Sequence, residues 1–228
     1  MAKLRYIVGR LRDQWQRHGF GACLRFITRQ LFWYSSTVVY HANLTEPFSP
    51  VEWENGERLL IIRPETLNRE LTSQLQGFLA EQGYEILSGI RKGTRLYVVR
   101  QRDHYLHRGC IAFGSRYNKL LGEREDVPVI GYCYTPEFAR RRGLYCRSLK
   151  GAMCNLRESG YKRVVIATRL TNLPSRRGIE AAGFSFLRIV HSWVFLQTIG
   201  VLRTEIGGEL RWRLVLLRPR GNHHSTYH

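Results

Sequence analysis

The sequence predicts a mixed α/β domain, with helices on both faces of a mixed sheet and two amphipathic helices preceding it. Three observations support this class. From residue 58 onward, apolar runs of strand length alternate with stretches of helical periodicity. Strand–helix–strand units require parallel crossovers, whereas a polar turn at Asp103 and His104 joins two strands as an antiparallel hairpin. Before residue 43, apolar residues recur at helical spacing with arginines between them.

Residues 1–42 are predicted to form a basic amphipathic helical extension. Its two helices have apolar faces at helical spacing, the first at Leu4, Ile7, Val8, Leu11 and Trp15 and the second at Phe20, Leu24, Ile27, Leu31 and Phe32. These faces either pack on the main domain or lie on an anionic membrane surface, and the sequence leaves both open. No apolar stretch here has the length of a signal peptide or a transmembrane helix, so we expect a cytoplasmic protein.

Residues 43–57 carry two prolines, an acidic cluster and a glycine, and are expected to be a linker. The main domain is placed at 58–218 and a disordered tail at 219–228. Strands are predicted over 58–64, 95–101, 107–116, 127–135, 162–168 and 184–197, followed by a hairpin over 204–217 that turns at Gly207 and Gly208. Helices are predicted over 65–83, with Gly83 as the C-cap, and over 143–160 and 173–183.

The charge balance narrows the class of partner. The chain has 36 Lys and Arg against 18 Asp and Glu, a formal net charge of +18. An excess of this size implies an anionic partner, which includes nucleotides, nucleic acids, membranes and acidic substrates. The five cysteines show no CxxC spacing and the histidines no HExxH pattern, so we expect reduced thiols and no metal site.

One stretch, "TPEFARRRGLYCRSLKG" (135–151), has the composition of an anion site. It follows a predicted strand and leads into a predicted helix, whose first N–H groups lack intrahelical partners. Gly143 allows close approach of a phosphate to the backbone, and Arg140, Arg141 and Arg142 add charge-assisted hydrogen bonds. A basic turn before an ordinary surface helix has the same local composition, so the surrounding sequence must distinguish it from an anion site.

That context resembles a known superfamily. The segment "VIGYCYTPEFARRRGLYCRSL" is similar to the acetyl-CoA-binding motif of the GNAT (GCN5-related N-acetyltransferase) superfamily, with Arg140, Gly143 and Tyr145 at its loop positions. Downstream, "VVIATRLTNLPSRRGIEAAGF" resembles the next motif of the family, with Asn172, Ser175, Gly183 and Phe184 in place. The resemblance covers residues 58–198, and the chain is similar to bacterial acyl-CoA N-acyltransferases.

The resemblance implies a mostly antiparallel central sheet, acetyl-CoA or another acyl-CoA as co-substrate, no metal, and direct attack by a primary amine on the thioester. The strand ending at Thr135 would diverge from its neighbour and expose backbone N–H groups near Tyr134. The implied CoA-binding residues are Tyr134, Thr135, Arg140, Arg141, Arg142, Gly143, Leu144, Tyr145 and Asn172.

Two positions depart from the family pattern. Tyr145 stands where the family prefers Gly or Ala, which implies a tighter loop or a displaced CoA. Ile179 stands where many members have the tyrosine that protonates the leaving thiolate, so Ser175 or water would replace it. The general base is unassigned: Glu137 and His107 are candidates by chemistry, as are His191 and Asp103. Cys133 and Cys146 are expected to be small buried residues rather than nucleophiles, because no His–Asp pairing accompanies them.

The acceptor is open. The basic extension and the positive charge fit a small-molecule or lipid-linked amine, such as an amino sugar of a surface-glycan pathway, with the chain peripheral at the inner face of the membrane. The alternative is a non-catalytic member of the same fold that binds an anionic membrane surface or nucleic acid. We do not expect a nucleic-acid partner, since no zinc-finger, helix-turn-helix or RNP-like pattern is present. Oligomeric state is not predicted.

Overall fold

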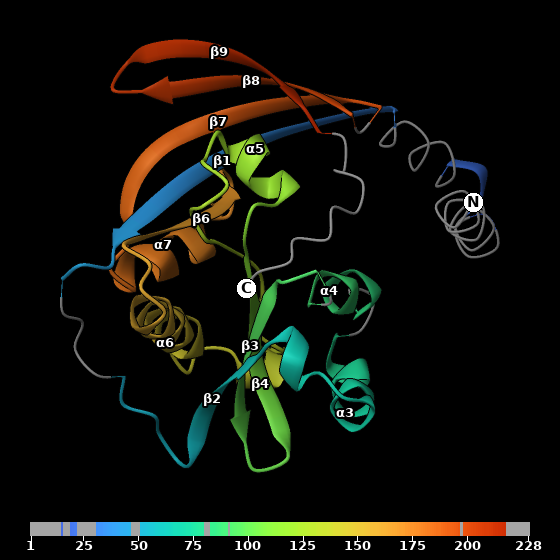
Figure 1. Ribbon diagram of the computed structural model, residues 1–228, viewed down its shortest axis with the longest axis vertical. Coiled ribbons are helices and arrows are strands. Elements are labelled where there is room, and N and C mark those ends of the chain that lie inside the picture. Colours follow the sequence, from blue (N-terminus) through green and yellow to red (C-terminus); the bar gives the residue numbers. More distant parts are fainter. Residues whose placement is uncertain are drawn as a thin grey trace, which may run out of the picture. The chain divides into compact units, whose positions relative to one another are not determined.

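The computed structural model describes residues 15, 19–21, 31–46, 51–79, 83–90, 92–196 and 198–217. The predicted N-terminal helices, up to residue 30, and the tail 219–228 lie outside these residues, apart from four positions. The strands are β1 (Phe32–Asn43), β2 (Glu57–Ile62), β3 (Arg95–Gln101), β4 (His104–Ala112), β5 (Val129–Tyr134), β6 (Arg163–Arg169), β7 (Ser185–Phe195), β8 (Ile199–Ile206) and β9 (Glu209–Leu216). They form one mostly antiparallel sheet in the order β2-β3-β4-β5-β6-β1-β7-β8-β9 (Figure 1).

Helices pack on both faces of the sheet at β3, as predicted. They are α3 (Arg69–Leu79), α4 (Gly83–Ile90), α5 (Arg116–Leu121), α6 (Leu144–Glu158) and α7 (Leu173–Ala181), with short 3-10 turns at Pro64–Thr66 and Glu137–Ala139. Strand β3 shows how the alternation works: Tyr97 packs in the cluster with Leu149 and Met153 of α6, whereas Val98 packs in the cluster with Leu75 of α3. Figure 1 shows α6 and α7 on one side of these strands and α3 and α4 on the other.

The described residues form two compact units. One consists of Thr37–Ile189, and the other combines the residues up to Ser36 with those from Val190 onward. The division falls within β1 and β7 rather than in the segment 43–57, where the sequence suggested a linker. Of that segment, Glu57 is already the first residue of β2 and is buried.

Strand β1 corrects the prediction that residues 1–42 are helical throughout. Residues Phe32–Asn43 form a strand of 12 residues that pairs antiparallel with β6, from Thr37 opposite Arg169 to Asn43 opposite Arg163. Val38, Val39 and Tyr40 are completely buried. The β-branched and aromatic composition of this stretch suits a strand, and its burial on both faces determines the outcome.

Two short helices were missed. Gly83 is the first residue of α4, not the C-cap of a helix over 65–83, which instead consists of a 3-10 turn and α3. The predicted strand over 107–116 ends at Ala112, and Ser115 caps α5 by accepting a hydrogen bond from the backbone N–H of Tyr117. The remaining strands and helices from β2 onward, including the turn at Gly207 and Gly208, are confirmed within a few residues.

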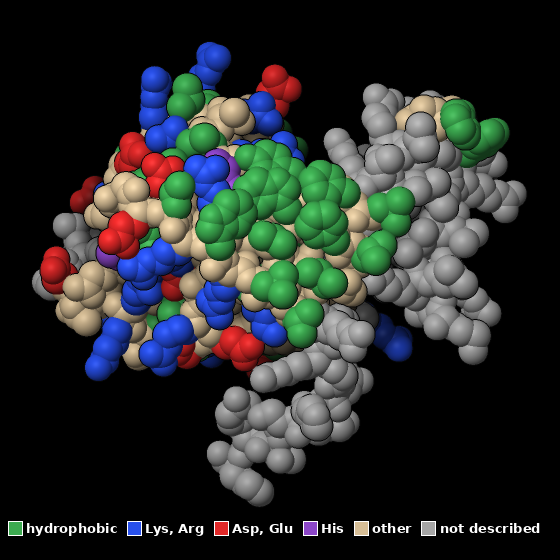
Figure 2. All heavy atoms as spheres, turned by 90° about the horizontal axis from the view of Figure 1, so that it is seen from above, with side chains coloured by type: hydrophobic (Ala, Val, Ile, Leu, Met, Phe, Trp, Pro, Cys, Tyr) green, Lys and Arg blue, Asp and Glu red, His purple; other side chains and the backbone are tan. Residues whose placement is uncertain are grey.

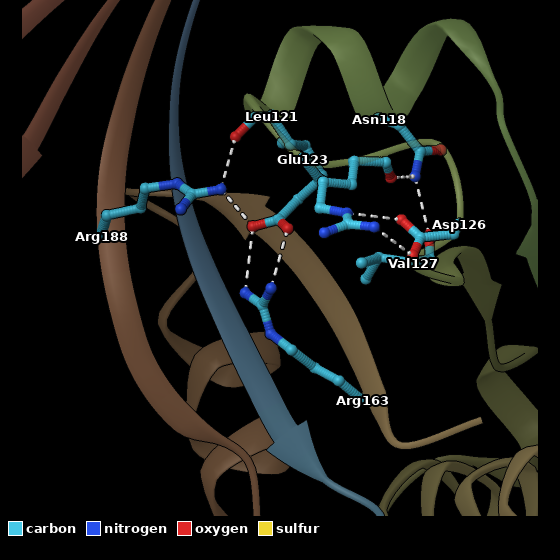
Figure 3. Close-up of polar contacts among 8 residues, drawn as sticks. Asn118, Leu121, Glu123, Asp126, Val127, Arg163 and Arg188 are labelled. Carbon is cyan, nitrogen blue, oxygen red and sulfur yellow. Dashed lines mark hydrogen bonds and ion pairs between the residues drawn. The ribbon is translucent and has the colours of Figure 1, made fainter.

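A buried carboxylate fixes the connection between α5 and β5. Glu123 accepts two hydrogen bonds from Arg163 of β6, each of 3.1 Å, and a further one from Arg188 of β7 (Figure 3). Arg188 also donates to the carbonyl of Leu121 at 2.9 Å. Asn118 donates to the carbonyl of Val127 at 2.7 Å. Because both carboxylate oxygens are engaged, this cluster is structural: it holds the segment that positions the start of β5.

Candidate functional site

The central feature of the site is the divergence of β5 from β6. The two strands pair in parallel only at Val129 with Val165 and at Ile130 with Ile166. Beyond Ile130 no rung between them is found in the described part of the chain, while β6 continues to Arg169 alongside β1. The predicted divergence at the end of this strand is therefore confirmed.

A β-bulge produces the divergence. The pairing of β4 with β5 shifts between Arg108, opposite Tyr134, and Cys110, opposite Gly131, so one extra residue is accommodated on β5. Tyr132 adopts a positive φ of 54° there, and Arg108 donates to its carbonyl at 3.2 Å. Beyond the bulge, the side chains of Tyr132 and Tyr134 are exposed, and Cys133 packs against the core. Neither tyrosine fills the core.

A tight loop follows β5 and leads into α6. Arg140 donates from Nε to the carbonyl of Thr135 at 3.2 Å, which closes the loop on itself. Arg141 and Gly143 both have positive φ, 62° and 67°. Gly143 is the N-cap of α6 and provides no side-chain hydrogen bond to the first turn. The loop thus leads into a helix whose N-terminal dipole end has no side-chain cap, the arrangement that favours anions.

The three arginines of the loop do not act alike. Arg142 donates to Glu57 Oε1 at 2.8 Å, and Arg147 of α6 donates to Glu57 Oε2 at 2.8 Å and to Glu54 at 2.9 Å. The carboxylate of Glu57 is buried, so its ion pair with Arg142 has a structural role in the domain. Arg140 and Arg141 are exposed and carry the positive charge of the loop toward solvent.

Sequence reasoning missed the part played by Glu54 and Glu57. Both belong to the acidic cluster that was interpreted as a linker. The one local signal was the position of Glu57 two residues before the apolar run of β2, where a charged residue needs a partner if it is buried.

Tyr145 occupies the space between α6 and α7. Its hydroxyl lies 3.1 Å from the Ser175 hydroxyl. A Cβ added at Gly178 would lie 2.6 Å from the Tyr145 ring, so only glycine leaves room for this tyrosine. Burial raises the pKa of the Tyr145 phenol well above its ordinary value, and the phenol is therefore neutral at physiological pH.

The second motif places Asn172 and Ile179 on α7. The Asn172 side-chain oxygen caps this helix by accepting from the Ser175 N–H at 3.3 Å, which leaves its amide N–H₂ available as a donor. Ile179 is completely buried and belongs to the core cluster of this unit. The residue at the position of the family's tyrosine therefore packs in the interior.

The four candidate bases differ in environment. His107 donates to or accepts from the Thr135 hydroxyl at 2.7 Å and is almost fully buried; burial and, second, Arg108 lower its pKa to about 3. A neutral, inaccessible imidazole positions Thr135 and is poorly suited to collect a proton from an acceptor. Asp103 is paired with Arg100 at an exposed turn, and Glu137 is exposed in the turn after Thr135. His191 and the residue that it contacts, Tyr34, both belong to the other compact unit, not to the unit that contains β5 and α6.

The cysteines behave as small buried residues. The Cys133 thiol lies 3.2 Å from the Tyr97 hydroxyl, and burial raises its pKa to about 11. Cys146 packs at the edge of the same core cluster. Within the described residues no group of His, Cys, Asp and Glu could hold a metal ion, and no helix is both long and apolar enough to cross a bilayer.

Comparison with family models and with curated proteins finds no match. Among solved structures, the chain is similar to a GCN5-related N-acetyltransferase from Sphaerobacter thermophilus, with 16% identity and a TM-score of 0.50 over 79% of this chain and 58% of that chain. An acetyltransferase from the GNAT family of Colwellia psychrerythraea aligns with 15% identity and a TM-score of 0.49 over 75% of this chain and 59% of that chain. The chain thus spans about three fifths of the length of these structures. The predicted GNAT fold is confirmed, and at these identities the likeness concerns the fold alone.

Proposed function

We propose that this chain, which has the fold of the GNAT acetyltransferases, transfers an acyl group from acyl-CoA to a primary amine, and that this group is acetyl, as the names of those neighbours indicate for them. One observation carries the proposal. Strand β5 leaves β6 after Ile130, directly before a loop with exposed arginines and a helix without a side-chain cap. This combination offers backbone donors and positive charge side by side, which suits a ligand with a diphosphate at one end and a carbonyl at the other.

The binding roles follow from the positions of the donors. The diphosphate of the carrier binds the first-turn N–H groups of α6, at Leu144 and Tyr145, with Arg140 and Arg141 alongside. The arm of the carrier runs along β5 toward Tyr134 and Thr135. The amide N–H₂ of Asn172 donates to this arm, since its oxygen is occupied by the cap of α7.

The proposed chemistry is direct attack of the amine nitrogen on the thioester carbonyl. A backbone N–H of β5 beyond the bulge stabilises the developing oxyanion, a term worth about 2.7–4 kcal/mol per donor in a well-studied enzyme. Glu137, exposed in the turn that follows Thr135, accepts the proton that the ammonium must lose. The Ser175 hydroxyl, bonded to that of Tyr145, donates a hydrogen bond to the departing CoA thiolate in place of the family's tyrosine, and water supplies the proton.

For the acceptor, we propose an amine that carries or adjoins negative charge. The formal net charge of +18 attracts such a substrate and speeds its encounter with the site. An amino sugar of a surface-glycan pathway, free or lipid-linked, supplies the primary amine, and the lipid-linked form adds the phosphates that this charge favours.

A second function, binding without turnover, is favoured by a specific observation. The ring of Tyr145 fills the space against Gly178, and Ile179 is buried where the family's proton donor stands. A chain that binds acyl-CoA, or an anionic surface, without catalysis would tolerate both features.

The decisive experiment measures release of the CoA thiol from acetyl-CoA in the presence of a panel of amino sugars and simple amines. Thiol release that depends on the amine supports the transferase, and Glu137→Gln should then lower kcat with little change in the KM for acetyl-CoA. Binding of acetyl-CoA without release with any amine would favour the non-catalytic alternative. Absence of acetyl-CoA binding would overturn the transferase and leave only the anionic-surface form of the alternative.

A further inference from the structure

The unit that contains β8 and β9 has an exposed apolar sheet face. Along β9, every second side chain is large, apolar and more than half exposed: Leu210 52%, Trp212 64%, Leu214 68% and Leu216 64%. Directly opposed residues of an antiparallel pair project from the same face. The face therefore continues onto β8 through the partners of these four residues, which are Glu205, Arg203, Val201 and Ile199.

Ring contacts extend the face to β7 and to the start of β1. Trp193 stacks on Trp212 with ring centroids 5.7 Å apart, and Tyr34 lies 5.3 Å from Trp193. Phe32 and Phe195 form a further pair at 5.3 Å. Figure 2 shows hydrophobic side chains gathered on one face of the molecule. We call this side of the four strands the apolar face; it consists of the four β9 residues, their partners on β8, and Phe32, Tyr34, Trp193 and Phe195.

The opposite side of the same strands is buried in part, and Arg211 and Arg213 on that side of β9 are exposed. Leu202 of β8, Val194 of β7 and Val215 of β9 are all buried. The exposed residues on that side of β9 are charged, whereas those of the apolar face on β9 are all hydrophobic. A contiguous exposed apolar surface of this kind marks an interaction site.

Charge indicates what the partner is. Arg203 lies opposite Trp212 within the apolar face; its buried Nε has no hydrogen-bond partner, and no ion pair of Arg203 is found among the described residues. The one acidic residue in these pairs, Glu205, lies near the turn at Gly207. A half-buried cation within an apolar surface, with no ion pair among the described residues, favours an anionic group on the partner.

The sequence on either side of the face adds to this charge. Phe32 directly follows a segment with one acidic residue, Asp13, and seven basic residues, Lys3, Arg5, Arg10, Arg12, Arg17, Arg25 and Arg29. Two further arginines, Arg218 and Arg220, come shortly after β9. Both ends of the chain that adjoin the apolar face are therefore basic.

We propose that the apolar face is the surface by which this protein docks on an anionic lipid bilayer. Leu210, Leu214 and Leu216 enter the boundary of the acyl chains, while the Trp and Tyr rings lie at the level of the headgroups. Arg203 binds a lipid phosphate, and the basic composition of the adjoining sequence favours an anionic surface. A second copy of this chain is a poorer match, because pairing two such faces would bring basic surfaces together. The proposal is independent of acyl transfer.

The test uses the full chain and vesicles of phosphatidylcholine with or without roughly one third phosphatidylglycerol. Flotation with these vesicles should show binding to the anionic lipid that weakens with added salt. Trp212→Ser combined with Leu214→Ser should weaken binding roughly tenfold or more, because less apolar area enters the bilayer. The matched control is Phe138→Ser, since Phe138 is equally exposed, at 69%, but lies in the turn after β5. Circular dichroism melting checks that all variants remain folded.

Arg203→Gln separates charge from apolar contact: it should reduce the preference for anionic over neutral vesicles severalfold while leaving the fold intact. Binding by the double variant that equals wild type would overturn the proposal, as would absence of vesicle binding by the full chain. A dimer in sedimentation equilibrium that dissociates in Trp212→Ser/Leu214→Ser would assign the face to a second copy instead. Loss of single-stranded RNA binding, with vesicle binding unchanged, in that variant would assign it to nucleic acid.

Discussion

Arg142 donates to the buried carboxylate of Glu57 at 2.8 Å, across 85 positions of the sequence. The same carboxylate accepts from Arg147 on its other oxygen. This relationship ties the first residue of β2 to the loop before α6, so the loop keeps its shape independently of any ligand. It also separates the arginine that builds the loop, Arg142, from Arg140 and Arg141, which remain exposed.

Glu57→Gln should lower the free energy of unfolding by about 2 kcal/mol. This is less than the 3–5 kcal/mol of a fully buried pair, because Arg142 keeps 33% of its side chain exposed. Urea unfolding followed by circular dichroism gives the value. Glu54→Gln is the control: Glu54 also pairs with Arg147 but is 61% exposed, so its loss should cost less than about 1 kcal/mol. Equal costs for the two variants would contradict the structural role of Glu57.

Gly143→Asp and Gly143→Asn form a matched pair that tests the anion site. At the φ of 67° Asp and Asn are tolerated better than most residues, and the two side chains differ in charge rather than in shape. A negative charge at the start of α6 stabilises the helix but repels a diphosphate. We expect Asp to bind acetyl-CoA roughly tenfold more weakly than Asn, with an equal or higher Tm. Calorimetric titration measures the affinities, and identical values would remove the diphosphate from this loop.

Gly178→Ala tests the packing of Tyr145. Alanine in a helix is normally favoured over glycine by about 1 kcal/mol. Here the new Cβ would lie 2.6 Å from the Tyr145 ring, so we expect a loss of about 1–2 kcal/mol instead. In a Tyr145→Ala background the same substitution should become neutral or stabilising, and a double-mutant cycle from urea unfolding measures this coupling. Additive effects would show that the two residues do not constrain one another.

The stability of the domain should depend on pH through His107. Its pKa is about 3 in the folded protein and about 6.5 in an unfolded chain, so between these values the unfolded state binds a proton that the folded state does not. Stability therefore falls as the pH falls through this window, by about 2 kcal/mol between pH 7 and pH 5 for this residue alone.

Urea unfolding at both pH values compares wild type with His107→Gln, which should lack that part of the loss. His104→Gln, at an exposed position three residues away, should retain it. Burial also lowers the pKa of His41, so this residue adds its own loss of stability as the pH falls. Only the difference between wild type and His107→Gln isolates the contribution of His107. Parallel pH dependence in wild type and His107→Gln would show that this imidazole is accessible to protons.

The path from β5 through the loop to α6 could be predicted because its signals are local. Pro136 and Gly143 mark the turn, and the apolar period changes from that of a strand to that of a helix within ten residues. Helix α4 was missed because glycines begin it and interrupt it, and α5 because six residues are too few to show a period. Strand β1 was missed because Leu31 and Phe32 continue an apolar helical spacing into a stretch that the sheet then buries.

The site itself was predictable only in outline. A sequence indicates which residues suit a phosphate, but not which of three adjacent arginines will find a buried carboxylate. The partners of Arg142 and of Tyr145 come from segments distant in sequence, at Glu57 and Ser175. Their contacts depend on how α6 packs, and no local pattern encodes that packing.

The place of β1 in the sheet has a consequence for how the chain acquires its structure during synthesis. Thr37 pairs with Arg169, so this early strand finds its partner only after more than a hundred further residues have left the ribosome. Until then the apolar side chains of Val38, Val39 and Tyr40 have no β6 to pair with, a condition that slows folding and invites binding by chaperones.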